Sequence, residues 1–422
     1  SVRSSDALLV MLVLLLFTIA STVSINPYHY GTFDNSITIP FVKAFANGSL
    51  YPNDYLLSQK AHYYTYLWDA VGFLMEAFHI GLPYLFFGFY FIAVYMTFAG
   101  VYFICMTLFG RREVAFLSLF FLLFAQESFG YVFTIESMFI TRGAALPFLL
   151  FSIYNYFNKR YTLSFFLLGL AYLIHPLTTH FVIFMIMVAS IVEIRSIGVR
   201  RLLLYVGVLI VTASPILIWA FLSSPPDLKM FHADPEWVNL LRLRSSHHIF
   251  PFSWDLRLFL QGAMELLAFV VAWKYRRDTN PEYHRIVKVF VGVIIAMCII
   301  GTVFSELWAV STVLVFQFLR GFQFFKYFAM MYVANYVVRE AQSREERSHT
   351  MIAAMITFGL LYGATLWKIA WVAIVALLGL LIFYRGRTRR EPAPVWAILA
   401  PVVVVTLLSG GEFVKRELSA ED

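Results

Sequence analysis

Long apolar runs separated by short charged segments recur along the whole chain. In the first half they cover residues 6–24, 83–109, 114–125, 144–157, 163–174 and 181–194. In the second half they cover residues 202–221, 258–273, 287–303, 304–338, 351–366, 371–384 and 395–408. Many approach the roughly 20 apolar residues with which a helix crosses the hydrocarbon core of a bilayer. We therefore predict one all-α integral membrane domain over residues 1–422, a polytopic transmembrane helical bundle of about 13 spans.

The composition agrees with this pattern. Hydrophobic residues make up 60% of the chain and charged residues only 14%, whereas soluble domains are about one-quarter charged. The apolar runs are continuous, which excludes the alternation of a transmembrane β-barrel. Both cysteines, Cys105 and Cys298, lie inside apolar runs, so we interpret them as small buried side chains rather than as disulfide or metal ligands.

The net charge of +7 comes largely from basic residues in short loops between apolar runs, which is a topology signal rather than a sign of nucleic-acid binding. Placing these loops inside leaves three outer segments, residues 25–82, 126–141 and 222–254. The assignment requires residues 62–80 to form an interfacial helix on the outer surface. The first run is expected to remain as a span, and the short loops indicate a multi-pass protein of the cell (inner or plasma) membrane.

The first outer segment carries polar residues directly after the first run, among them Tyr28, His29 and Asp34. The pattern over residues 37–45 predicts a short surface helix. Asp34 would then lie just above the membrane, where a carboxylate can deprotonate a hydroxyl acceptor or orient a sugar. An ordinary loop with surface carboxylates is the alternative interpretation.

The second outer segment brings Glu127, Glu136 and Arg142 close together in the sequence. They form either a local Glu–Arg pair or a second acidic group with an anion-binding arginine that faces the same cavity as Asp34. The planar donor fork of a guanidinium suits phosphate, which is why Arg142 is a candidate for that role.

His175 and His180 lie between two short apolar runs, on either side of the helix breaker Pro176. Ionisable groups at membrane depth are candidates for function. The spacing of five residues is poor for one metal ion on one helix face. We therefore expect a hydrogen-bonded pair that lines a cavity, or a plain helix junction, rather than haem or metal ligands.

Two later segments add basic residues. The third outer segment contains Arg242, Arg244, His247 and His248 beside aromatic residues. These either contact an anionic head group or a lid partner, or belong to a solvated loop. Arg320 and Lys326 are expected near the outer leaflet, where they either hold a lipid phosphate or snorkel to the surface.

Over residues 8–194, the order of features resembles that of GT-C-type glycosyltransferases. The resemblance is carried by the segment FDNSITIPFVKAFANGSLYPNDY after the first run, by the aromatic stretch 62–80, by the turn Gly110-Arg111-Arg112 and by the second acidic outer segment. It divides the domain into a GT-C-like core module, residues 1–194, and additional helices, residues 195–422.

The resemblance implies a membrane enzyme that transfers a sugar from a polyprenyl-phosphate donor to an acceptor at the outer face. Asp34 would be the first-loop acid, and Glu136 or Glu127 the second. Arg142, Arg320 or Lys326 would hold the phosphate. Asp34 is followed by Asn35, where many members of the family have two adjacent acids.

Two other functions stay open. A non-catalytic GT-C-like subunit of a larger membrane complex would pair Asp34, Glu136 and Arg142 with each other or with neighbouring chains. A transporter ranks third, because no internal repeat is visible. The expected partners are membrane lipids, the lipid-linked sugar donor and, for the second hypothesis, other subunits, but not nucleic acid. No cofactor is assigned, and the need for a divalent metal is left open.

Overall fold

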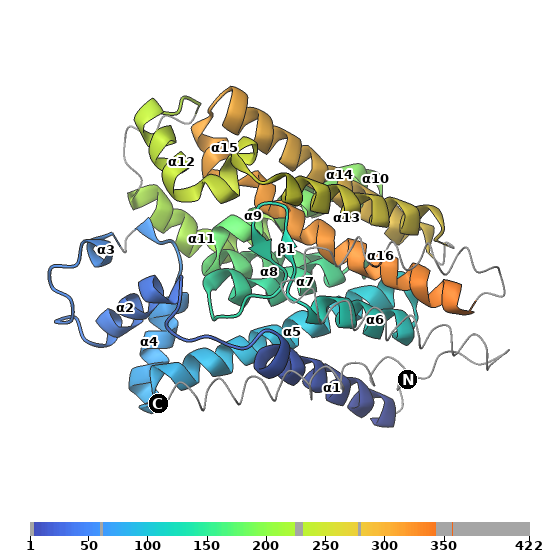
Figure 1. The fold of residues 1–422 in the computed structure, drawn as a ribbon, viewed down its shortest axis with the longest axis horizontal. Helices are drawn as coiled ribbons and strands as arrows, with labels where there is room; N and C mark the ends of the chain where they lie inside the picture. Colours follow the sequence, from blue (N-terminus) through green and yellow to red (C-terminus); the bar gives the residue numbers. More distant parts are fainter. Residues whose placement is uncertain (1–3, 60–61, 224–230, 277–279, 343–356, 358–422) are drawn as a thin grey trace.

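The computed structural model describes residues 4–59, 62–223, 231–276, 280–342 and 357, which are mostly helical (Figure 1). Within them, five helical segments are long and apolar enough to cross a membrane: Asp6–Ile25, Leu82–Phe109, Val199–Ser223, Leu256–Lys274 and Pro281–Leu307. The polytopic helical prediction is confirmed, but the number of about 13 spans is not. The runs expected at 351–366, 371–384 and 395–408 lie outside the described residues.

The first part of the chain forms the predicted helices and one short helix, α3 (Tyr55–Ser58), that was not predicted. They are α1 (Ser4–Ile19) with its π-helical continuation η1 (Ala20–Ile25), α2 (Asn35–Ala46), α3 (Tyr55–Ser58), α4 (Leu67–Phe78), α5 (Leu82–Phe109), α6 (Arg112–Leu123), α7 (Thr141–Phe157), α8 (Tyr161–Ile174) and α9 (Pro176–Val192). Helices α2 and α4 occupy the positions of the two surface helices expected in the first outer segment. Two short strands, β1 (Glu127–Ser128) and β2 (Val132–Phe133), were not predicted.

The second part contains one long expected run that is not a single span. Its elements are α10 (Ile194–Ile197), α11 (Val199–Ser223), α12 (Pro235–Ile249), η3 (Pro251–Ser253), α13 (Leu256–Lys274), α14 (Pro281–Thr302), η4 (Val303–Leu307), α15 (Ser311–Phe316), η5 (Phe318–Gly321) and α16 (Phe322–Gln342). The run 304–338 is therefore divided among η4, α15, η5 and α16. One break comes at Gln317, whose left-handed backbone (φ 48°) ends α15.

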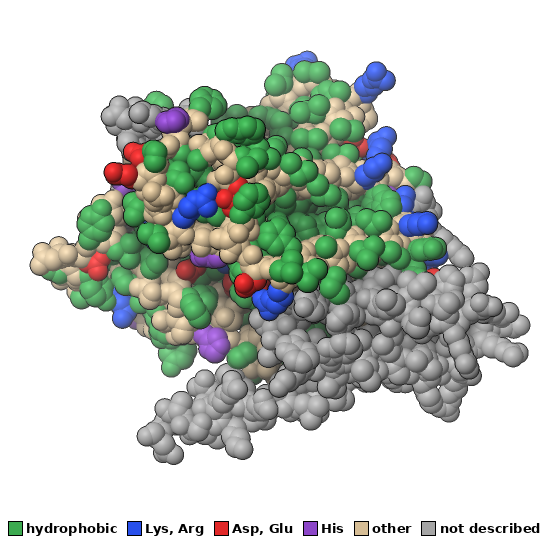
Figure 2. Space-filling view, turned by 45° about the horizontal axis from the view of Figure 1, so that its top comes forward, with side chains coloured by type: hydrophobic (Ala, Val, Ile, Leu, Met, Phe, Trp, Pro, Cys, Tyr) green, Lys and Arg blue, Asp and Glu red, His purple; other side chains and the backbone are tan. Residues whose placement is uncertain are grey.

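The two ends of the bundle differ in character. Figure 1 shows α2, α3, α4 and α12 at the left end, away from the junction of α5 and α6 at the right. Figure 2 shows lysine and arginine side chains along the right-hand edge. The left end is the one that the charge bias predicts to be outer, and we call it the outer end.

Helix α16 lies at the centre of the core. Every residue from Phe322 to Val338 is buried, and the helix packs against α6 and α13. Helix packing inside a bilayer depends on van der Waals contact and hydrogen bonds rather than on hydrophobic transfer. The polar residues Gln323 and Lys326 are buried in the outer half of α16, so they need partners within the protein.

Candidate functional site

All three outer segments meet at residues 126–142. In the β1–β2 hairpin, Glu127 pairs with Phe133 and Ser128 with Val132 in antiparallel register. The segment is not a solvated loop, because Gln126, Ser128 and Thr134 are fully buried. The outer segments therefore converge on a fixed centre rather than on a mobile connection.

The first outer segment is bonded to this centre through the backbone. The His29 N–H donates to Ser137 O at 2.8 Å, and Asn35 Nδ2 donates to Phe139 O at 2.9 Å. The third outer segment reaches the same centre through His248 Nδ1, which lies 2.8 Å from Gly130 O. These bonds bring together regions that lie far apart in the sequence.

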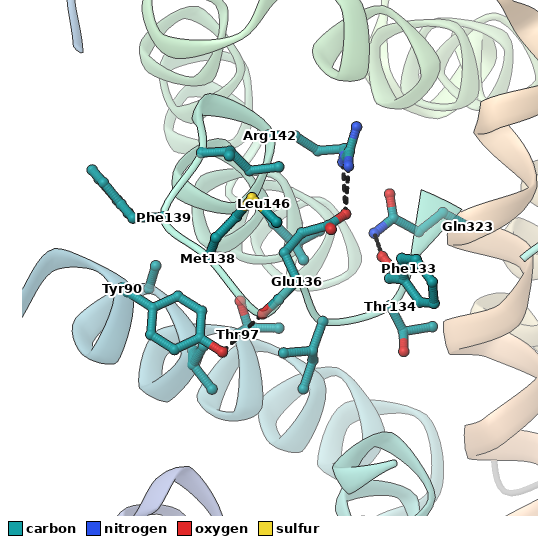
Figure 3. A pocket seen from close by; sticks show the side chains of 15 residues that line it. Tyr90, Thr97, Phe133, Thr134, Glu136, Met138, Phe139, Arg142, Leu146 and Gln323 are labelled. Atoms are coloured by element: carbon teal, nitrogen blue, oxygen red, sulfur yellow. Dashed lines mark hydrogen bonds and ion pairs between the residues drawn. The ribbon is translucent and has the colours of Figure 1, made fainter. Parts of the chain in front are cut away.

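Glu136 and Arg142 form a largely buried ion pair. Arg142 donates to Glu136 Oε1 from Nε at 2.9 Å and from Nη2 at 2.6 Å, and the two side chains are 13% and 11% exposed. Figure 3 shows the guanidinium above the carboxylate, while Tyr90 donates its hydroxyl to Glu136 O at 2.8 Å. The neighbouring cavity has a volume of about 20 Å³, enough for one water molecule.

Arg320 approaches the same ion pair from η5. It is only 8% exposed, and its Nη1 donates to the neutral amide of Gln317 at 2.6 Å. Among the described residues, no carboxylate lies within ion-pair distance of it. Burial, and then Arg142, lower the pKa of Arg320 to about 9, while Glu136 and Asp34 act in the opposite direction. A guanidinium with these neighbours is still cationic at neutral pH.

Asp34 is the exposed member of this group. It precedes α2, and its carboxylate caps no backbone N–H of that helix. Its charge nevertheless acts on both Arg320 and His247. Asp34, Glu136, Arg142 and Arg320 thus share one electrostatic neighbourhood at the outer end, and we call these four residues the outer cluster.

Strained backbone conformations occur beside this cluster. Three residues other than glycine have left-handed backbones there: Phe33 (φ 45°), Tyr131 (φ 56°) and Gln317 (φ 48°). Phe33 precedes Asp34, Tyr131 lies in the hairpin turn, and Gln317 accepts the hydrogen bond of Arg320. Each such conformation costs about 1–3 kcal/mol and persists only where the surroundings impose it, which is common at functional sites.

Helix α12 adds two histidines that the sequence offered only as a weak candidate. The rings of His247 and His248 lie 4.0 Å apart. Because a carbonyl oxygen only accepts, His248 Nδ1 carries the proton that it donates to Gly130. Burial, and then Arg320, lower the pKa of His248 to about 2, so this ring is neutral. Residues 235–249 of the third outer segment therefore form a helix that is bonded to the hairpin through His248.

The histidines at the α8–α9 junction bond to their own neighbours. His175 Nδ1 lies 3.0 Å from Thr141 Oγ1, and His180 Nε2 lies 3.2 Å from the Tyr172 hydroxyl. His175 and His180 are therefore not hydrogen-bonded to each other. Their positions fit the alternative interpretation, a plain helix junction. Within the described residues, no group of three or more His, Cys, Asp or Glu side chains is placed to hold a metal ion.

Lys326 and Glu127 lie apart from the outer cluster. Lys326 is fully buried, with Nζ 2.7 Å from Glu265 Oε1, so snorkelling is the wrong interpretation. The Glu127 carboxylate accepts from Arg257 at 3.1 Å. Burial raises the pKa of Glu127, while Arg257 and Lys326 lower it. Its side chain belongs to a local surface pair.

Tyr28 contributes packing beside the ion pair. Its ring lies 4.9 Å from that of Tyr90 and 5.4 Å from that of Phe87. Its buried hydroxyl has no hydrogen-bond partner among the described residues. Burial accordingly raises the pKa of Tyr28. His29 is joined to the centre by its backbone, through the bond to Ser137.

No family model matches the chain, and no curated protein matches it by sequence. Its structure is similar to the crystal structure of ArnT from Cupriavidus metallidurans in the apo state, with a TM-score of 0.51, 13% identity, and coverage of 99% of this chain and 78% of that one. The crystal structure of ArnT bound to undecaprenyl phosphate gives a TM-score of 0.48, 12% identity, and 99% and 79% coverage. The likeness to the apo structure confirms the GT-C-type fold that the sequence resemblance implies.

Proposed function

We propose that this chain is a membrane glycosyltransferase that takes a sugar from a polyprenyl-phosphate donor and gives it to an acceptor hydroxyl at the outer membrane face. The observation that carries the proposal is the outer cluster itself. An exposed carboxylate, a second carboxylate and two guanidinium groups come together on a GT-C-type fold, at the end of the bundle that the charge bias predicts to be outer.

In this reaction Asp34 is the base. Its carboxylate takes the proton of the acceptor hydroxyl while the acceptor oxygen bonds to the anomeric carbon of the sugar. The bond between that carbon and the phosphate oxygen breaks, and the polyprenyl phosphate leaves with the electron pair. Asp34 suits the role because it is exposed and caps no backbone N–H of α2.

Arg142 and Arg320 stabilise the phosphate as it leaves. Arg320 is bonded only to a neutral amide among the described residues, so an incoming oxyanion would give it a charged partner. Arg142 is bonded to Glu136, which holds its guanidinium in place before the donor binds. Cationic donors placed in a buried site stabilise developing negative charge without reorganising.

Consumption of polyprenyl-phosphate sugars tests this proposal. The purified chain would be placed in proteoliposomes with lipid extract from its source membrane, and lipid-linked sugars followed by mass spectrometry. We expect turnover by the natural chain and a roughly 100-fold or greater loss for Asp34→Asn, the usual contribution of a catalytic base. Asp54→Asn is the matched control. Asp54 is exposed in the same segment and caps α3 by accepting from Leu57 N, a role that asparagine also fills.

A second function, a non-catalytic subunit on the same scaffold, is favoured by one observation. The Glu136–Arg142 pair is closed, and the cavity beside it holds about 20 Å³. A subunit that uses these charges only for packing would consume no lipid-linked sugar, and Asp34→Asn would change its folding or its assembly instead.

A further inference from the structure

Buried polar side chains from α13 and α16 hold the backbone of the β1–β2 hairpin. There are four of them, and we call them the hairpin frame: Gln261, Gln323, Lys326 and Tyr327. Two of the four converge on Glu127 O, the first carbonyl of β1: Lys326 donates to it from Nζ at 2.6 Å, and Gln261 donates from Nε2.

The other two frame residues bind β2 and the residue that follows it. Gln323 donates from Nε2 to Phe133 O at 2.9 Å, and the Tyr327 hydroxyl donates to Thr134 O at 2.6 Å. Phe133 is the residue that pairs with Glu127 across the hairpin. The frame therefore fixes both strands at the end from which the chain continues to Glu136.

Glu265 orients half of the frame. Its Oε1 accepts from Lys326 Nζ at 2.7 Å and from Gln261 Nε2 at 3.0 Å, and the Lys326 and Glu265 side chains are both 0% exposed. Desolvation makes a buried ion pair a weak source of stability, and apolar residues of similar volume often serve as well. A role in placing a particular backbone segment explains these polar residues better than stability alone.

The frame also extends to the cationic side of the outer cluster. The hairpin turn lies so close to η5 that a Cβ atom at Gly130 would be 2.9 Å from Leu319 O and 3.1 Å from Arg320 N. A displacement of the hairpin would therefore move Glu136 and Arg320 relative to each other. Glu136 is fixed from its other side by Tyr90, which donates to Glu136 O.

We propose that the hairpin frame positions Glu136 within the outer cluster, with Lys326 acting through the loop backbone rather than on a lipid phosphate. This inference rests on the proposed function and deepens it. Tyr327 is the most informative member, because its hydroxyl holds the carbonyl two residues before Glu136. Tyr327→Phe removes that bond to the hairpin, together with the 3.3 Å bond that the hydroxyl accepts from Gln323 Nε2, and leaves the ring in the core.

Tyr332→Phe is the matched control. Tyr332 is also a fully buried tyrosine of α16, but its hydroxyl lies 2.6 Å from His284 Nδ1, away from the hairpin. Amide hydrogen exchange of residues 127–136 measures the frame without any activity. We expect exchange roughly fivefold faster in Tyr327→Phe, the effect of one lost neutral hydrogen bond, and no change in Tyr332→Phe. Equal exchange in both variants would overturn the proposal.

Turnover of lipid-linked sugar tests the link to Glu136. We expect Tyr327→Phe to lower kcat roughly tenfold with the donor KM unchanged, because misplacing Glu136, which orients Arg142, slows the chemical step more than binding. In a Glu136→Gln background the same substitution should cause no further loss. A loss that persists in that background would contradict the role through Glu136. If the natural chain turns over no donor, the proposed function fails, while hydrogen exchange still decides whether the frame holds the hairpin.

Discussion

Arg142 donates two hydrogen bonds to one oxygen of the Glu136 carboxylate, from Nε at 2.9 Å and from Nη2 at 2.6 Å. This differs from the paired fork in which each N–H group meets its own oxygen. The pair is largely buried and lies near a second guanidinium, that of Arg320. An incoming phosphate can therefore exchange with Glu136 on Arg142 without leaving a cation unpaired.

Arg142→Lys tests the need for the guanidinium fork. A lysine keeps the charge but cannot present a planar fork of N–H donors, first to the Glu136 carboxylate and then to the phosphate. We expect the donor KM to rise roughly tenfold, with the thermal midpoint little changed. Arg257→Lys is the control, since the Arg257 side chain is 63% exposed and pairs with Glu127 outside the cluster. Equal donor KM values for the natural chain and Arg142→Lys would show that donor binding does not need the guanidinium fork.

Substitution of Arg320 and of Arg142 by methionine should change the stability of the fold in opposite directions. Arg320 is buried with only an amide partner among the described residues, so Arg320→Met relieves desolvation and should stabilise the fold by about 1–3 kcal/mol. Arg142→Met leaves Glu136 buried without its cation and should destabilise by about 3 kcal/mol. Both variants should lose affinity for a polyprenyl phosphate. Thermal unfolding in detergent and lipid binding measure the two effects, and a destabilised Arg320→Met would show that its charge serves the fold.

His248 should make the free energy of unfolding depend on pH. Its pKa is about 2 in the fold, against about 6.5 in an unfolded chain. Below about pH 6.5 the unfolded chain binds a proton that the folded chain does not, so the free energy of unfolding decreases as pH falls. His248→Asn keeps a donor for Gly130 O and removes the titration. We expect a smaller drop in thermal midpoint between about pH 7 and pH 4.5 for this variant than for the natural chain, with exposed His62→Asn unchanged.

Gly130 tests how closely the hairpin is fitted to η5. Its φ is +97°, and an added Cβ would meet the Leu319 and Arg320 backbones within about 3 Å. Gly130→Ala should destabilise by about 2 kcal/mol or more, since neither backbone can move aside freely. Gly88→Ala in α5 has open space and should be neutral or stabilising. Similar unfolding curves for the two variants would mean that the hairpin is not held against η5.

Apolar periodicity predicted the helices well because their length and composition are local properties. The surface helices α2 and α4, the long helices α5 and α11, and the position of Asp34 before α2 all follow from residues that lie next to one another. The Glu136–Arg142 pair was also within reach, because the two residues lie six positions apart in the sequence.

The features of the structure that could not be predicted from the sequence depend on contacts between distant segments. The ion pair of Lys326 with Glu265 joins two helices, and the sequence around either residue does not indicate its partner. The burial of the hairpin depends on four donors from α13 and α16, so nothing within residues 126–142 indicates it. The run 304–338 was expected as one span because Phe, Leu and Val continue across the break, which is made by the backbone of Gln317.

The proposed function requires the outer cluster to bind the phosphate of a polyprenyl lipid. A cryo-EM map of the natural chain in nanodiscs containing undecaprenyl phosphate measures this, with Arg320→Met as the comparison. We predict phosphate density between Arg142 and Arg320, with the lipid chain leaving toward the bilayer and no such density in the variant. A map in which Glu136 still occupies Arg142 and the lipid is absent from the cluster would contradict the account.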